Sequence, residues 1–212
     1  MSDENNKDKG MMNIAVFASG RGTNFGAIIR AVKKGKIKAS LSLLVCDNPK
    51  AGAIGRAKRA GIKVALVQRK DFATKKDFEA KIVEHLEADK IDLIVLAGFM
   101  RLLSPEFVSR YKGRIVNIHP ALLPCFKGTR SIKDAFDYGA KITGVTVHFV
   151  DEEMDHGPII LQKEVKIEER DTLESLEVKV HKVEHQIYPE AVRLFIEGKL
   201  NLEGRKVRIS AR

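Results

Sequence analysis

The sequence predicts an α/β fold with a mostly parallel central sheet and flanking helices. Up to about residue 120, short apolar runs typical of buried strands alternate with amphipathic segments typical of helices. The chain has 212 residues, which suits one domain with a substantial core. We therefore expect a flexible N-terminal extension over residues 1–11 and a single domain over residues 12–212.

Repeated strand and helix units build the expected parallel sheet. The expected strands are residues 13–18, 41–46, 62–67, 92–97 and 114–119, and the expected helices are 25–34, 51–60, 74–88 and a short one after 104. Gly61 is a natural residue to end the second helix. Ser104 and Pro105 are a natural N-cap and first residue for the fourth helix.

After residue 120 the pattern changes from parallel units to a hairpin. Residues 143–150 and 158–167 alternate like two strands joined by an acidic turn, so an antiparallel hairpin fits better than another crossover. A short helix is expected over 132–138. Asp171 and Glu174 then predict a capping box for a long C-terminal helix that reaches about residue 197 and that Pro189 can bend.

Composition excludes several classes of protein. The net charge is +10, yet no zinc-finger spacing or other nucleic-acid motif accompanies it, so the basic clusters are interpreted as solvated surface. These clusters are Lys33, Lys34, Lys36, Lys38, Arg205, Lys206, Arg208 and Arg212. No apolar run is long enough to cross a bilayer, and no signal peptide is evident. Two distant cysteines suit a reducing compartment. We expect a cytoplasmic protein without membrane or nucleic-acid partners.

A glycine-containing turn, SGRGTN at residues 19–24, links the first strand to the first helix. Backbone N–H groups at a helix N-terminus can bind phosphate, and glycines allow close approach. The turn is no Walker A loop, because no Gly-Lys-Ser/Thr follows, and Phe25 replaces the third glycine of the dinucleotide fingerprint. Asp47 ends the second strand as a candidate ribose-binding acid. The turn alone leaves a phosphate site and a tight structural turn both open.

Asn117 and His119 are the strongest candidates for chemistry. Side chains alternate along a strand, so both emerge on one face, and Pro120 should end the strand directly after them. Ligands of open α/β sheets bind at the carboxyl ends of strands. An amide and a protonated imidazole can both donate hydrogen bonds to an oxyanion. No serine or cysteine stands beside them as a nucleophile, so we expect the attacking atom to come from a substrate.

Asp155, in the acidic turn DEEMDHGP, is the third candidate. A carboxylate near His119 would favour the imidazolium and orient it. The alternative is that the acidic turn is only a solvated connection between two strands. A metal site could be assembled from Asp155, His156, His148 and His119. The histidine spacing disfavours this alternative, because no two lie four residues apart on an expected helix. We expect no metal.

In combination the motifs resemble the phosphoribosylglycinamide formyltransferases of purine synthesis, in their folate-dependent, single-domain form. The similarity extends from about residue 12 to about residue 198 and rests on SGRGTNF at 19–25, VLAGFMRLLSPEFV at 95–108, RIVNIHPALLP at 114–124, GVTVHFVDEEMDHGPIILQ at 144–162 and EHQIYPEAV at 184–192. It implies a Rossmann-like formyltransferase fold. It also implies formyl transfer from 10-formyltetrahydrofolate to glycinamide ribonucleotide, both small-molecule substrates.

The resemblance also assigns roles to individual residues. The catalytic set that it implies is Asn117, His119 and Asp155. The residues that it implies for the ribonucleotide are Gly22, Thr23 and Asn24 at the phosphate, and Glu184. The residues that it implies for the folate are Lys75, Met100, Arg101, Leu102, Leu103 and Val108.

The chain departs from the family pattern at two places. Residues 125–132 read CFKGTRSI, with Lys127 in place of a usual proline and Arg130 or Ser131 where a histidine is common. His156 follows Asp155, where small residues are common. Ligand contacts of the 125–131 loop are therefore not carried over from the family.

Three other functions use part of these features. A methionyl-tRNA formyltransferase shares the catalytic motif but has a separate C-terminal domain, for which we expect no room here. A formyltetrahydrofolate hydrolase would keep the three catalytic residues and use water as the nucleophile. A non-enzymatic nucleotide-binding module would explain the glycine turn only. A monomer and a homodimer are both compatible with the sequence.

Overall fold

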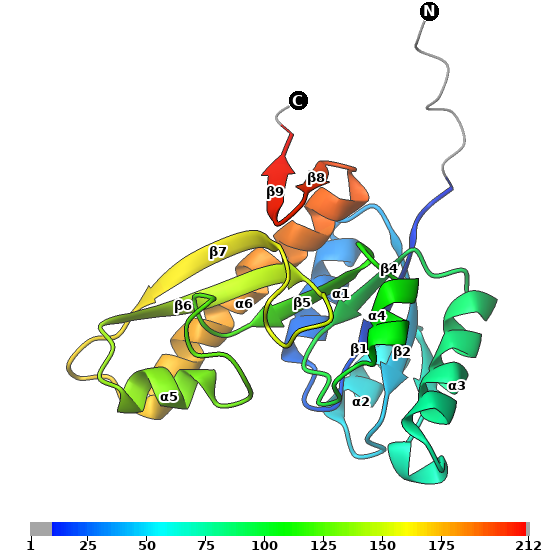
Figure 1. The fold of residues 1–212 in the computed structure, drawn as a ribbon, viewed down its shortest axis with the longest axis horizontal. Helices are drawn as coiled ribbons and strands as arrows, with labels where there is room; N and C mark the ends of the chain where they lie inside the picture. Colours follow the sequence, from blue (N-terminus) through cyan, green and yellow to red (C-terminus); the bar gives the residue numbers. More distant parts are fainter. Residues whose placement is uncertain (1–9, 211–212) are drawn as a thin grey trace, which may run out of the picture.

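The computed structural model describes residues 10–210. Residues 1–9 of the expected N-terminal extension and Arg212 of the basic C-terminus lie outside this range. Within it, nine strands form one sheet in the order β3-β2-β1-β4-β5-β6-β7-β9-β8, with helices on both faces (Figure 1). The predicted α/β class is therefore confirmed.

The parallel half of the sheet is the one that the sequence predicts. Its strands are β1 (Asn13–Phe17), β2 (Ser40–Cys46), β3 (Lys63–Leu66), β4 (Leu93–Leu96) and β5 (Ile115–His119), all paired in parallel. The helices between them are α1 (Thr23–Lys33), α2 (Gly52–Ala60), α3 (Lys75–Ala88) and α4 (Pro105–Arg110). Gly61 ends α2 in the left-handed conformation, with φ 71°, and Ser104 caps α4.

Two apolar cores lie on the two faces of this sheet. Alternate residues of β1 divide between them: Ile14 and Val16 pack under α1, α2 and α6, whereas Ala15 and Phe17 pack under α3 and α4. All four side chains are fully buried. Burial on both faces explains why the parallel strands are continuous apolar runs rather than alternating ones.

Beyond β5 the sheet becomes antiparallel. A loop and α5 (Ser131–Asp137) lead to β6 (Ile142–Phe149), which pairs antiparallel with both β5 and β7 (Ile159–Lys166). The predicted hairpin is therefore confirmed. A Cβ at Gly144 would lie 2.5 Å from Leu122 Cδ2, so β6 needs glycine where the loop after β5 crosses it.

The long helix α6 (Leu173–Ile196) follows the hairpin and remains continuous through Pro189. The predicted Asp171–Glu174 capping box is wrong. Thr172 is the N-cap, and it exchanges hydrogen bonds with Ser175 at 3.2 and 3.1 Å. The Asp171 carboxylate is instead engaged by the Glu168 N–H and by Lys179, hydrogen bonds that lower its pKa to about 2.

Two elements at the chain end and one short helix were not predicted. Strands β8 (Leu200–Glu203) and β9 (Lys206–Ile209) form a second hairpin, and β9 pairs with β7. A 3₁₀ turn, η1 (Arg69–Asp71), precedes α3. Lys206 and Arg208 of the basic C-terminal cluster lie on β9, and their side chains are exposed.

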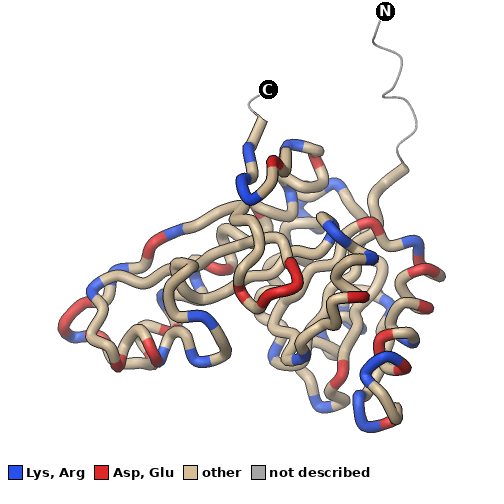
Figure 2. The backbone as a smooth tube through the Cα atoms, in the orientation of Figure 1, with Lys and Arg blue, Asp and Glu red and all other residues tan. Residues whose placement is uncertain are grey.

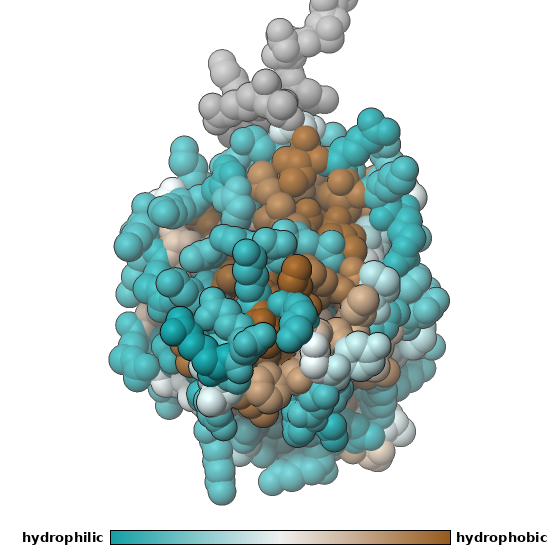
Figure 3. All heavy atoms as spheres, turned by 90° about the vertical axis from the view of Figure 1, so that its left-hand side faces the viewer, coloured by the Kyte–Doolittle hydropathy of each residue, from teal (hydrophilic) through white to brown (hydrophobic). Residues whose placement is uncertain are grey.

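Charge and hydropathy vary over the surface. Figure 2 shows acidic residues gathered on the loop between β6 and β7. Figure 3 views the molecule from the left-hand side of Figure 1 and shows a mostly hydrophilic surface around a band of hydrophobic side chains. Among the helices of residues 10–210, none has the length and apolar character needed to cross a membrane.

Candidate active site

Asn117 and His119 lie on the same face of β5, as the strand alternation predicts. Their neighbours Val116 and Ile118 point to the opposite face and pack in the core under α6. The strand ends at His119, directly before Pro120. Asn117 is half-buried and His119 is 3% exposed, so the pair stands at a shielded carboxyl end of a strand.

Both ring nitrogens of His119 have an acceptor beside them. Nε2 donates to the Phe126 carbonyl oxygen at 2.8 Å, and Nδ1 lies 3.4 Å from Oδ2 of Asp155. A carbonyl oxygen only accepts, so Nε2 carries a hydrogen, and a proton on Nδ1 would complete an imidazolium facing a carboxylate. The Asp155 side chain is 10% exposed and also accepts the Gly128 N–H at 2.9 Å.

His148 is a site residue whose role the sequence analysis missed. It stands opposite Asn117 in the β5–β6 pairing, and its Nε2 lies 3.2 Å from the Asn117 Nδ2. Its Nδ1 donates to the Phe149 carbonyl oxygen at 2.7 Å. Burial lowers the pKa of His148, so the ring is neutral and its Nε2 accepts. This acceptor turns the nitrogen side of the Asn117 amide toward His148 and leaves a second N–H on that nitrogen.

Asp155 is held by a loop of unusual backbone conformation. Its φ of 48° lies in the left-handed region, which non-glycine residues rarely adopt, and Phe126 in the facing loop has the same φ. These two residues contact His119 from opposite loops. Left-handed non-glycine residues cluster at functional sites, so this conformation agrees with a role for the pair.

The glycine turn and Glu184 lie together, although they are far apart in the sequence. Asn24 Nδ2 donates to Oε2 of Glu184 at 3.1 Å, and Nδ1 of His181 donates to the same oxygen at 2.8 Å. The hydrogen bond to Glu184 raises the pKa of His181. Gly22 has φ 69°, and a Cβ there would lie 2.8 Å from the Cβ of Ala53. The turn therefore requires glycine and brings the start of α1 against α2.

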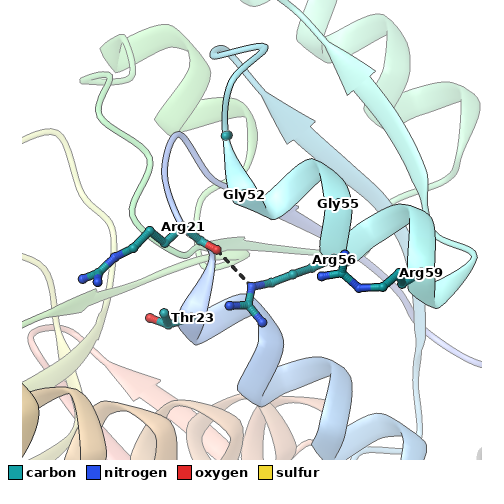
Figure 4. A pocket seen from close by; sticks show the side chains of 7 residues that line it. Arg21, Thr23, Gly52, Gly55, Arg56 and Arg59 are labelled. Carbon is teal, nitrogen blue, oxygen red and sulfur yellow. Dashed lines mark hydrogen bonds between the residues drawn. The ribbon is translucent and has the colours of Figure 1, made fainter.

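A basic pocket opens beside this turn. Arg21, Thr23, Arg56 and Arg59 line it together with the N-terminal part of α2, around a cavity of about 650 Å³ (Figure 4). Arg56 Nε donates to the Arg21 carbonyl oxygen at 3.0 Å. No acidic side chain of residues 10–210 forms an ion pair with these three arginines. The α1 N-terminus lacks a side-chain cap, so its N–H groups and the nearby arginines suit an anion.

The segment expected to line a folate pocket begins where β4 ends and touches the glycine turn. The N–H of Met100 donates to Ser19 Oγ at 2.9 Å, and Arg101 Nε pairs with Asp47 Oδ2 at 2.6 Å. The candidate ribose acid Asp47 is thus paired with a residue of the segment that was expected to bind folate. Met100 and Leu102 are each 66% exposed, which leaves large apolar surface available to a planar ligand.

The other expected folate residues lie deeper or farther along α3. Leu103 and Val108 are buried in the core under α3 and α4. Lys75 is the first residue of α3, and its Nζ lies 3.9 Å from Oε1 of Glu79, which accepts the Ser104 N–H at 2.8 Å. Glu79 therefore connects Lys75 to the end of the folate segment.

The atypical 125–131 loop covers the catalytic candidates through its backbone. Phe126 and Gly128 contact His119 and Asp155 by main-chain groups, as described above. Lys127 is exposed, Arg130 pairs with Asp134 at 3.2 Å, and Ser131 is buried at the start of α5. The departures from the family pattern thus leave these two main-chain contacts in place.

The alternative metal site does not assemble. Nε2 of His148 binds Asn117, Nε2 of His119 binds the Phe126 carbonyl, and His156 turns to Asp151. Each ring has its own partner, and no group of three potential metal ligands gathers anywhere in the part of the chain that the structure describes.

Comparisons with known proteins agree with this geometry. The Formyl transferase family profile matches residues 12–192. The chain is 45% identical to the phosphoribosylglycinamide formyltransferase of Bacillus subtilis, over 92% of this chain and 100% of the relative, and 41% identical to that of Haemophilus influenzae, over 91% of both. A solved glycinamide ribonucleotide transformylase from Symbiobacterium toebii superimposes with a TM-score of 0.93 at 41% identity, over 96% of each chain.

Proposed function

This chain belongs to the formyl transferase family, and we propose that it transfers a formyl group from 10-formyltetrahydrofolate to the amine of 5′-phosphoribosylglycinamide, a step of purine biosynthesis. Relatives that carry the name phosphoribosylglycinamide formyltransferase are similar over more than nine tenths of the chain. The fold of the solved transformylase from Symbiobacterium toebii agrees with the predicted fold class.

The observation that carries the proposal is the meeting of three groups at one strand end. Asn117 and His119 share a face of β5, and Asp155 Oδ2 lies 3.4 Å from His119 Nδ1. Two hydrogen-bond donors backed by a carboxylate suit the stabilisation of an oxyanion. A nucleotide-binding module would have no use for this arrangement.

In the proposed mechanism the glycinamide amine attacks the formyl carbon. The carbonyl oxygen becomes a tetrahedral oxyanion, which accepts hydrogen bonds from the free N–H of Asn117 and from Nε2–H of His119. The Phe126 carbonyl oxygen holds that Nε2–H in the described structure, so the substrate oxygen must replace it. Asp155 faces Nδ1 of His119 and orients the ring, and the amine proton passes, through water, to the departing folate nitrogen as the bond between that nitrogen and the formyl carbon breaks.

The two substrates are proposed to approach this centre from opposite sides. Gly22, Thr23 and Asn24 would bind the ribonucleotide phosphate, aided by the basic pocket, and Glu184 would bind the rest of that substrate. Lys75, Met100, Arg101, Leu102, Leu103 and Val108 remain the proposed folate residues. The contact between Met100 and Ser19 supports a shared boundary between the two sites. Fixing both reactants in attack geometry would supply much of the rate enhancement.

One assay tests the proposal against its rivals. The protein is incubated with 10-formyltetrahydrofolate, with and without glycinamide ribonucleotide, and the release of tetrahydrofolate is followed. Release that requires the ribonucleotide supports the transferase, whereas equal release without it supports the hydrolase. Asn117→Ala and His119→Ala should each lower kcat about 10²- to 10³-fold, the cost of one oxyanion donor. Asn201→Ala, at an exposed hairpin position, is the control.

Location and assembly are part of the proposal. A cytoplasmic location suits two free thiols, buried Cys46 and exposed Cys125. Small-molecule substrates and the absence of a required metal are likewise proposed. Monomer and homodimer both remain predictions, and gel filtration coupled to light scattering distinguishes them.

A further inference from the structure

A bridge of side chains joins the C-terminal hairpin to the loop that carries Asp155. Arg205 lies in the turn between β8 and β9, and its Nη2 donates to the His156 carbonyl oxygen at 2.7 Å. Its Nη1 lies 2.9 Å from Nε2 of His156. Nδ1 of His156 lies 2.7 Å from Oδ2 of Asp151. The bridge therefore spans from the hairpin to the second residue after β6.

The two partners of His156 hold different parts of its ring. The Asp151 carboxylate only accepts, so Nδ1 of His156 donates to it. Nη1 of Arg205 lies 2.9 Å from Nε2 and 3.2 Å from Nδ1, so the guanidinium lies over the face of the ring and not in line with one nitrogen. The carboxylate thus fixes one edge of the ring, and the guanidinium covers its face.

The base of the same loop is fixed independently of the bridge. The Phe149 N–H donates to the Pro158 carbonyl oxygen at 2.9 Å, and a Cβ at Gly157 would overlap the Phe149 carbonyl oxygen. These contacts close the ends of the loop but do not reach its acidic tip. Arg205 adds a contact on the side of the hairpin, because its Nη2 donates to the His156 carbonyl oxygen.

The residue next to His156 is Asp155, whose backbone is left-handed. A left-handed conformation is unfavourable for a non-glycine residue and persists only when its surroundings hold it. The Asp155 carboxylate must face His119 from this backbone. The Gly128 N–H holds the Asp155 carboxylate from the facing loop, and His156 is the neighbour that holds its backbone, so a shift of His156 would change the distance between Asp155 and His119.

We propose that Arg205 is a positioning residue for the proposed formyl transfer: by clamping His156, it holds Asp155 at His119. The proposal rests on the proposed function. It gives a role to a hairpin that lies beyond residues 12–192, the part matched by the family profile. It also explains why this chain tolerates histidine at 156, because the ring is the middle of the bridge.

The test measures kcat and KM for Arg205→Ala. We expect kcat to fall about tenfold, because small misplacements of a catalytic group are costly, while KM for the ribonucleotide stays within about twofold. Arg208→Ala is the matched control, since Arg208 is on the same hairpin but pairs with Glu203 at 2.8 Å. An unchanged kcat in Arg205→Ala, or an equal loss in Arg208→Ala, would overturn the proposal.

A double-mutant cycle tests the route through His156. In a His156→Ala background only the backbone contact of Arg205 remains, so Arg205→Ala should cost about threefold rather than about tenfold. Equal losses in both backgrounds contradict the bridge. If Arg205→Ala does not fold, Arg205→Gln replaces it, because glutamine lacks the charge and the two-pronged donor.

A measurement without substrate separates this proposal from the proposed function. In ¹⁵N NMR of the histidine rings, Arg205→Ala should shift the ring-nitrogen resonance of His156, because the guanidinium beside both ring nitrogens is gone. An unshifted resonance would contradict the bridge even if formyl transfer occurs. A shifted resonance in a protein that lacks formyl transfer would leave the bridge standing and refute the proposed function.

Discussion

Asn117 and His148 face each other across the antiparallel pair β5 and β6, and the Asn117 amide donates to Nε2 of His148 at 3.2 Å. This contact decides which end of the amide points toward the other catalytic candidates. The second N–H of Asn117 is available to a substrate because His148 takes the first.

Replacing His148 should therefore misorient Asn117. His148→Leu is expected to lower kcat about tenfold with little change in KM, because the amide loses its acceptor and rotates. His148→Gln keeps an acceptor oxygen and should recover part of the loss. Steady-state kinetics check both variants, and equal activity of His148→Leu and wild type would contradict the orientation argument.

His148 and His181 should change the stability of the protein in opposite directions as pH rises. Burial lowers the pKa of His148, so its contribution is present above the ordinary value of about 6.5 and is lost as pH falls. Glu184 raises the pKa of His181, so its contribution is present below about pH 6.5 and is lost as pH rises through the folded-state value.

Melting temperatures across pH test this pair. His148→Gln should flatten the acid loss of stability, whereas the difference between wild type and His181→Gln should be largest at acidic pH and shrink as pH rises. Parallel curves for wild type and both variants would show that neither residue titrates as its surroundings require.

Gly22→Ala should impair the glycine turn. The new Cβ would meet Ala53 at 2.8 Å, in a backbone with φ 69° that disfavours alanine by roughly 1–2 kcal/mol. We expect KM for the ribonucleotide to rise at least about tenfold, because the N–H groups of the turn move. Gly20→Ala is the matched control, since a Cβ there has open space. Similar KM values for the two variants would remove the turn from the substrate site.

Tyr188 should matter for stability rather than for chemistry. Its hydroxyl is fully buried, donates to the Leu96 carbonyl oxygen at 2.7 Å and lies 3.1 Å from that of Val116. Tyr188→Phe leaves these oxygens without that donor and should lower the free energy of unfolding by about 1–2 kcal/mol. Urea denaturation measures the change, with 82% exposed Tyr138 as the control position. A Tyr188→Phe protein as stable as wild type would contradict the role.

The sequence predicted the parallel half of the fold because its strands are buried on both faces. It missed β8 and β9, although both alternate apolar and polar residues, because each run is only four residues long and mostly exposed. Asp171 and Thr172 are both good N-cap residues, and Asp171 is instead engaged by Lys179 and by the Glu168 N–H. The cap pattern alone does not tell which of two adjacent candidates is used.

Some residues of the candidate site could be predicted from the sequence, and others could not. Asn117 and His119 follow from strand alternation, and Asp155 from its acidic turn together with the family resemblance. The role of His148 depends on the register between β5 and β6, and the role of Arg205 on a hairpin that was not expected. Such roles arise from pairings between distant segments, which a single sequence does not reveal.

The antiparallel pairing of β5 and β6 joins the parallel half of the sheet to the rest of it. A cut in the exposed 125–130 loop would leave the glycine turn, Asn117 and His119 on one fragment, and Asp155 and Glu184 on the other. Each half would hold part of the proposed ribonucleotide site and part of the catalytic set. Formyl transfer by two separately expressed fragments would therefore require that β5 and β6 pair between them, so activity would measure this pairing.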